Sequence, residues 1–142
     1  IAFDLSTIPT NAVVDSAYLS LYFGQSYVDG GGYYTDHSGD NAFTINKITS
    51  PWAESTLTWN NQPTISTTNQ AIIPAFTNYR QHYPKMNVKN LVADMILNPS
   101  ASFGFGLRHQ IESLYKITLF TMSNDTTYPA FRPKLQVYYH LP

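Results

Sequence analysis

The sequence predicts an all-β fold, a jelly-roll-like antiparallel β-sandwich with one short α-helix at about residues 87–97. Two observations favour this class: apolar and polar residues alternate with period two in several short segments, and turn-forming stretches separate those segments. A third is that one segment alone has the period of a helix. The 142 residues are enough for one domain with its own core. We therefore expect a single β-sandwich domain over residues 1–142.

The expected strands are short and follow one another closely along the chain. Segment 16–23 places Ala17, Leu19, Leu21 and Phe23 on one face, and segment 1–5 begins directly with the same alternation. The remaining strands are expected at 42–48, 103–109, 114–121 and 134–140. The stretches 8–12, 28–41, 61–70, 98–102 and 123–129 are rich in turn-forming residues and are expected to connect strands.

The single helix is expected within NVKNLVADMILNP. One helical face carries five apolar residues, which are Val88, Leu91, Val92, Met95 and Ile96. Asn87 is the expected N-cap, and Asn98-Pro99 is expected to end the helix.

The composition is typical of a domain that works outside the cell. Charged residues make up 12% of the chain, about half the usual share, while eleven tyrosines and many hydroxyl and amide side chains are present. The net charge is −1 and no basic run occurs, so nucleic acid is not an expected partner. No apolar run reaches the roughly 18 residues of a membrane span, so membrane insertion is not expected either.

The sequence does not predict an enzyme. Glu54 and Glu112 are the only glutamates, and Glu54 lies in a Ser/Thr-rich turn, where a carboxylate usually accepts hydrogen bonds from backbone N–H groups. The histidines, His37, His82, His109 and His140, lack metal-ligand spacing and are expected to be exposed on strands and loops. No nucleophile elbow or phosphate-binding loop occurs.

Two kinds of binding site remain candidates. Calcium is a possible cofactor, because Asp29, Asp36, Asp40 and Asn41 supply oxygen ligands in a glycine-rich stretch, although a solvated loop is the commoner explanation of such a stretch. Sugar binding requires exposed aromatic rings next to polar groups. Three clusters offer this arrangement, namely Tyr27, Tyr33 and Tyr34, then Tyr79, Arg80, His82 and Tyr83, and finally Tyr18 and Tyr22. Each cluster could instead be covered by the second sheet.

Six ordered segments carry a family resemblance. They are FDLSTIP, AYLSLY, SPWAESTLTWNNQP, NVKNLVADMI, FGFGLR and FTMSNDTTYPAFRPKLQVYY. Over nearly the whole chain this order resembles the DNRLRE-domain family, which overlaps the disaggregatase-related repeat and carbohydrate-binding modules attached to alginate lyases. The resemblance implies a non-catalytic, extracellular β-sandwich on a secreted or cell-surface protein.

The resemblance also implies that PWAESTLTWNNQP is a structural signature of the fold. The residues assigned to it are Trp52, Glu54, Thr56, Trp59, Asn60, Pro63, Arg132 and Pro133. Trp52 is expected to close one end of the core, and Leu57 and Trp59 to share one face of a short strand. Glu54 is expected to tie the turn, and Arg132 to tie residues 123–125 to the last strand.

Related domains usually carry a further β segment before the FDLS strand, and the domain is expected to lack it here. The first functional hypothesis is a carbohydrate-binding or adhesive module, whose partner is a polysaccharide or cell-surface glycan. The alternative is a structural subunit of an extracellular filament or surface layer, in which a donor strand from a neighbouring copy completes the sandwich.

Overall fold

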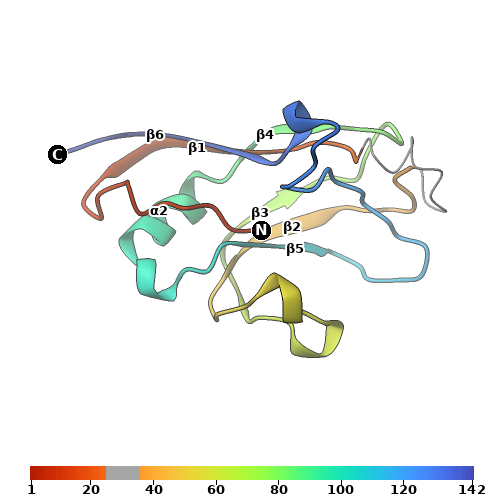
Figure 1. Cartoon of the computed structure of the whole chain (residues 1–142), viewed down its shortest axis with the longest axis horizontal. Coiled ribbons are helices and arrows are strands. Elements are labelled where there is room, and N and C mark those ends of the chain that lie inside the picture. Colours follow the sequence, from red (N-terminus) through yellow and green to blue (C-terminus); the bar gives the residue numbers. More distant parts are fainter. Residues whose placement is uncertain (25–35) are drawn as a thin grey trace.

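The computed structural model describes residues 1–24 and 36–142, and these form two antiparallel three-stranded sheets (Figure 1). One sheet has the strand order β4-β1-β6, with β4 at Tyr83–Asn87, β1 at Val13–Leu21 and β6 at Lys134–His140. The other has the order β3-β2-β5, with β3 at Ile65–Ile73, β2 at Phe43–Ile48 and β5 at Phe105–His109. The predicted β-sandwich class is confirmed.

The core lies between the two sheets and beneath the single α-helix of the described residues. Ala17 and Leu19 point inward from β1, and Phe43 and Ile45 point inward from β2. Helix α2 (Lys89–Leu97) packs its apolar face against this core, with Leu91, Val92, Met95 and Ile96 buried. Alternation in the strands and the helical period therefore bury one face of each element, as the sequence indicates.

A buried ion pair joins β2 to α2. The Lys47 ammonium contacts the Asp94 carboxylate, and Lys47 is only 8% exposed. Because a buried charge requires its partner, helix α2 is held against β2 by charge as well as by apolar contacts.

Helix α2 starts slightly later than predicted. Asn87 is still the last residue of β4, paired with Tyr18, so Val88 takes the N-cap position. The Asn87 side-chain oxygen nevertheless accepts a 3.0 Å hydrogen bond from the Lys89 backbone N–H. The predicted C-terminal end is confirmed, since Asn98 follows the last helical residue.

Four predicted strands, β1, β2, β5 and β6, are confirmed with small shifts in their end residues, whereas two other predicted strands do not form. Segment 114–121 forms only isolated bridges at Ile117 and Phe120. Instead of a short strand, Leu57 and Thr58 lie between two 3-10 turns, η1 (Glu54–Thr56) and η2 (Trp59–Asn61). Strand β3 occupies part of a stretch predicted as a turn, and β4 was not predicted. Both depend on pairing with distant strands, which their own polar or proline-containing sequences do not signal.

The N-terminal segment keeps its alternation without forming a strand. Ile1, Phe3 and Leu5 pack against the core, while the residues between them are exposed. Ile1 and Phe105 exchange two hydrogen bonds, of 2.7 and 2.8 Å, at the outer edge of β5. Two further 3-10 turns, η3 (Pro99–Ala101) and η4 (Pro129–Phe131), lie in connections. Every helix within the described ranges is too short or too polar to cross a membrane.

Candidate ligand-binding groove

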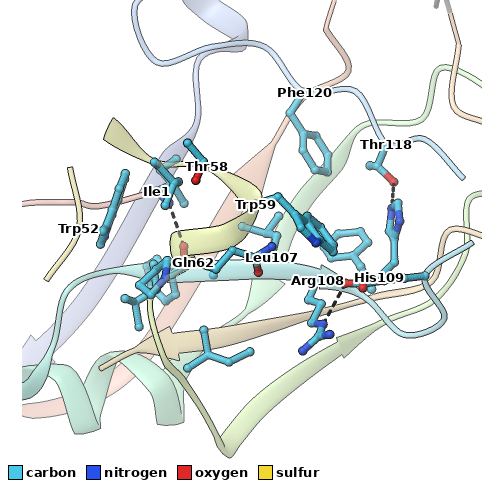
Figure 2. A pocket seen from close by; sticks show the side chains of 18 of the residues that line it. Ile1, Trp52, Thr58, Trp59, Gln62, Leu107, Arg108, His109, Thr118 and Phe120 are labelled. Carbon is cyan, nitrogen blue, oxygen red and sulfur yellow. Dashed lines mark hydrogen bonds and ion pairs between the residues drawn. The ribbon is translucent and has the colours of Figure 1, made fainter. Parts of the chain in front are cut away.

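A groove of about 890 Å³ runs between β5 and the segment 51–63 (Figure 2). Figure 1 shows this segment below β5, on the side of the molecule away from the β4-β1-β6 sheet. The groove has an apolar part, to which Leu57, Leu107 and Phe120 contribute, and a polar part with Arg108 and Glu112. It therefore combines the two kinds of surface that a small-molecule or glycan site needs.

The wall of the groove is built by side-chain hydrogen bonds within PWAESTLTWNNQP. Trp52 anchors the start of the segment, because its indole N–H donates to the Phe103 carbonyl at 2.8 Å. Asn61 fixes the next turn, since its amide oxygen accepts a bond from the Thr58 hydroxyl at 2.9 Å and its amide nitrogen donates to the Thr56 carbonyl at 2.8 Å. These bonds hold the backbone of η2, and with it Trp59.

Trp59 is a large aromatic side chain of the groove wall that is mostly exposed to solvent. It is 73% exposed although it lines the groove, and Figure 2 shows its indole over the β5 ribbon, where Leu107 and Phe120 also line the groove. The predicted short strand that would share Trp59 and Leu57 on one packed face is not formed. A rigid backbone thus presents a large aromatic ring to solvent beside an apolar surface.

The other residues of the expected signature have varied positions. Pro63 is half-buried and lines the groove, whereas Thr56 and Asn60 are exposed. No hydrogen bond to the Glu54 carboxylate occurs among the described residues, and it does not tie the turn as expected. Its charge acts on the Ile1 amino group, whose pKa is lowered by burial and raised to a smaller extent by Glu54.

Arg132 lies far from the groove, in the connection before β6. Its Nε donates to the Asp125 carbonyl at 2.7 Å, and the Asp125 carboxylate accepts bonds from the backbone N–H groups of Thr127 and Tyr128. Pro133 follows directly and is half-buried. This arrangement holds the 123–128 connection against the start of the last strand.

The polar end of the groove contains an ion pair and a histidine. Arg108 Nε contacts Glu112 Oε1 at 2.9 Å, and both side chains are largely open to solvent. His109 Nε2 lies 2.9 Å from the Thr118 hydroxyl. Burial lowers the pKa of His109, with a further lowering by Lys116 and an opposing effect of Glu112, so the ring is neutral at pH 7.

A second hollow, of about 490 Å³, continues the groove across the outer face of the β3-β2-β5 sheet. Four residues line both hollows, namely Ile65, Arg108, His109 and Glu112. Hydroxyl and amide side chains dominate the second hollow, and they include Thr44, Asn46, Thr67 and Gln70. The Asn46 amide nitrogen donates to the Thr44 hydroxyl at 2.8 Å. The apolar groove and the polar sheet face therefore form one continuous surface.

The predicted cluster at residues 79–83 is only partly a surface. Tyr79 is 67% exposed, but Arg80 Nε is paired with Asp36 Oδ1 at 2.7 Å and His82 Nδ1 accepts the Phe23 backbone N–H at 3.1 Å. Tyr83 is 4% exposed and belongs to the core, so its prediction as a surface residue is wrong. The reason is register: Tyr83 pairs with Leu21, and both side chains point between the sheets.

The predicted calcium ligands do not gather in the part of the chain that the structure describes. Asp40 is exposed, and Asn41 is buried with its amide oxygen accepting the Phe76 backbone N–H at 3.0 Å. Its amide nitrogen donates to the Thr118 hydroxyl at 2.8 Å. Asp29, Tyr27, Tyr33 and Tyr34 lie outside the described residues. Within those residues, no three His, Asp or Glu side chains form a group that could hold a metal ion.

His37 is buried, contrary to the prediction that the histidines are exposed. Its Nδ1 accepts the Leu119 backbone N–H at 3.2 Å, so the proton sits on Nε2, which donates to the Gln81 carbonyl at 3.0 Å. Burial lowers the pKa of His37, and the ring also packs against Phe23 at 5.1 Å. His37 is therefore a neutral structural residue of the sandwich end near the groove.

A β-sandwich with an open surface groove of aromatic and polar side chains has the architecture of a ligand-binding module. The chain belongs to carbohydrate-binding module family 96, whose model matches residues 1–137. No curated protein and no solved structure gives a significant match. The family consists of non-catalytic binding modules, so the carbohydrate-binding part of the predicted resemblance is confirmed.

Sequence reasoning missed the groove because its residues come from distant parts of the chain. Arg108 and Glu112 are four residues apart, but this spacing predicts a charge pair only on a helix, and the segment was expected as a strand. Trp59 has no sequence signal either, since its exposure depends on how the segment 51–63 lies against β5.

Proposed function

We propose that the groove binds a polysaccharide chain, with Trp59 as the platform on which one sugar ring stacks. The observation that carries this proposal is the 73% exposure of an indole whose backbone is fixed by side-chain hydrogen bonds. Pyranose rings present apolar C–H faces that pack on aromatic rings, so an exposed, rigid tryptophan fits them well. Membership of a carbohydrate-binding family supports the same ligand class.

The polar groups of the groove complement this platform. Gln62 lies beside Trp59 (Figure 2), and the Arg108–Glu112 pair stands where the groove meets the polar sheet face. Together they offer both donors and acceptors for sugar hydroxyls. Because the two hollows are continuous, the ligand is a chain of several sugar units, which crosses β5 from the indole toward Gln70.

Replacing Trp59 by alanine is expected to weaken polysaccharide binding by about 10- to 100-fold, as is usual for a central aromatic contact. Native electrophoresis through gels that contain neutral or carboxylated polysaccharides measures this loss as reduced retardation. The unfolding midpoint in urea should stay near that of the wild type, because the side chain is mostly exposed.

Tyr79→Ala is the matched control for this experiment. Tyr79 is also an exposed aromatic residue, but it does not line the groove. Its removal should leave retardation unchanged. Full retardation of Trp59→Ala, or a loss only in Tyr79→Ala, would place the site outside the groove and contradict the proposal.

We also infer a setting outside the cell, on a secreted or surface protein, and a kinship with DNRLRE-domain proteins. The scarcity of charged side chains and the six ordered segments support both inferences. Polysaccharides are ligands that such a protein meets at the cell surface.

We propose as a second candidate that a strand from a neighbouring copy completes the sandwich at β5. Gly104 and Gln110 hydrogen-bond to β2, so by alternation Phe105, Leu107 and His109 direct their backbone groups to the other edge. Ile1 pairs with Phe105, but no backbone hydrogen bond of Leu107 or His109 occurs among the described residues. An open strand edge beside an apolar groove is a template for strand addition.

Strand donation predicts assembly in solution. Light scattering should then show a mass that rises with protein concentration, and Leu107→Pro should abolish this rise. Proline removes only the N–H that faces the open edge, so the pairing of β5 with β2 is retained. A concentration-independent monomer mass for the wild type would rule this candidate out.

A further inference from the structure

The outer face of the β4-β1-β6 sheet carries a second set of aromatic and polar side chains. Ala17 and Leu19 point into the core from β1, so Ser16 and Tyr18 point outward. Leu135 and Val137 pack against the core from β6, so Gln136 and Tyr138 point outward as well. None of these outward residues lines the groove at β5.

The register places these residues in two rows across the sheet. Tyr18 pairs with Asn87 of β4 on one side and with Gln136 of β6 on the other. In the next row Ser16 pairs with Tyr138, which is 55% exposed. Tyr18 and Tyr138 are therefore diagonal neighbours, roughly 7–8 Å apart at their backbones. Tyr18 is thus flanked by the Asn87 and Gln136 side chains, and Tyr138 lies in the next row.

An aromatic cluster borders this face at the other end of β1. Tyr22 packs edge-on against Phe131 at 5.7 Å and against His82 at 5.5 Å, and His82 stacks on Phe131 at 5.2 Å. Figure 1 shows η4, which contains Phe131, above the end of this sheet. The aromatic cluster therefore lies at one end of the face that carries the Tyr18 row.

The two surfaces lie on opposite sides of the molecule. The polar hollow of Thr44 and Arg108 is on the outer face of the β3-β2-β5 sheet, and the Tyr18 row is on the outer face of the other sheet. Figure 1 shows the two sheets as separate layers, and the buried core residues come from both of them. One extended ligand cannot lie on both faces at once.

We propose that the row Asn87, Tyr18 and Gln136, together with Tyr138, is a second polysaccharide-binding surface, and that the module bridges two chains. The occupant is a pyranose chain: the tyrosine rings stack on sugar faces, and the flanking amides donate to and accept from hydroxyls. Two exposed lysines lie near Ser20, two residues from Tyr18: Lys134 pairs with Ser20, and the Lys85 backbone N–H donates to the Ser20 hydroxyl. Their ammonium groups suit carboxylated as well as neutral chains. Binding at this surface is independent of the groove, whereas bridging rests on the proposed function of the groove.

The test compares binding with bridging in four proteins: the wild type, Trp59→Ala, the double variant Tyr18→Ala/Tyr138→Ala, and the triple variant. Retardation in polysaccharide gels measures binding. Turbidity or light scattering of a soluble polysaccharide at increasing protein concentration measures bridging. When both surfaces of one molecule bind chains in the same gel, the second contact forms at a high effective concentration. Loss of either surface should therefore weaken the apparent affinity measured by retardation by about 10-fold or more.

The expected result is that wild-type protein causes turbidity, that either surface variant abolishes it but keeps measurable retardation, and that the triple variant is not retarded. Retardation and turbidity of the double tyrosine variant equal to wild type would overturn the second surface. If the groove does not bind polysaccharide but the second surface does, the result differs: Trp59→Ala is retarded as the wild type is, and the double tyrosine variant is not retarded. Retardation without any wild-type turbidity would overturn bridging.

Tyr18 is half-buried, so its replacement by alanine could disturb the fold. Tyr18→Phe and the single variant Tyr138→Ala resolve this question. The phenylalanine keeps the ring, so it should preserve binding, while Tyr138→Ala at an exposed position should weaken binding with an unchanged urea midpoint. Weaker binding that always parallels a lower midpoint would contradict a contact role.

Discussion

Asp94→Leu is expected to lower the free energy of unfolding by about 3 kcal/mol, because it leaves the Lys47 ammonium buried without its carboxylate. The side chain of Lys47 is 10% exposed and that of Asp94 is 29% exposed. The lysine therefore depends more on its partner than the aspartate does. Since a typical domain is stable by about 5–15 kcal/mol, a loss of this size is a large fraction of the total.

A double-mutant cycle separates the charge effect from lost packing. Lys47→Met should be less harmful than Asp94→Leu, because the remaining carboxylate still reaches water and still accepts the Asn98 side-chain amide at 2.9 Å. The double variant Lys47→Met/Asp94→Leu should recover most of the loss, since two apolar side chains of similar size fill the same space. Urea unfolding measures all four proteins. Losses of Lys47→Met and Asp94→Leu that simply add in the double variant would show that the pair is not coupled.

The second large effect is expected at Gly104, directly before β5. Its φ is +107°, a conformation open essentially to glycine alone, and an added Cβ would lie 2.4 Å from the Ile1 carbonyl oxygen. Gly104→Ala must therefore displace Ile1 from Phe105, at the end of the groove. We expect a loss of about 2–4 kcal/mol in unfolding free energy and weaker polysaccharide retardation.

Gly106→Ala is the matched control, two residues further along the same strand. A Cβ there would meet the Ile65 side chain at 3.1 Å, which can shift, and the backbone needs no positive φ. The expected change is within about 1 kcal/mol. Hydrogen exchange at the Phe105 N–H, which donates to Ile1 at 2.7 Å, gives a local readout. Equal stability of the two alanine variants would contradict the assigned role of Gly104.

The local sequence was sufficient to locate a strand or helix wherever one face of that element is covered by the core. Alternation located β1, β2, β5 and β6, and the helical period located α2. These signals work because burial selects apolar residues at every second position of a strand or along one stripe of a helix. The family resemblance, which rests on ordered segments, pointed to a carbohydrate-binding module, as the family match then confirmed.

The candidate sites depended on pairing between distant segments. A period shows that two residues share a face, but it does not show whether another sheet covers that face. Tyr83 and Tyr18 look alike in sequence, yet register buries the first and leaves the second on the outer surface. For the same reason β3 and β4 became visible only through their partner strands.

By itself the sequence determined a β-sandwich with one helix and a carbohydrate-binding kinship, because these follow from short-range patterns and the order of segments. Only the tertiary structure decided that Trp59 is exposed beside a groove and that Tyr18 stands between two amides on the opposite face. Exposure is a property of what surrounds a side chain, and here those surroundings come from strands far apart in the chain.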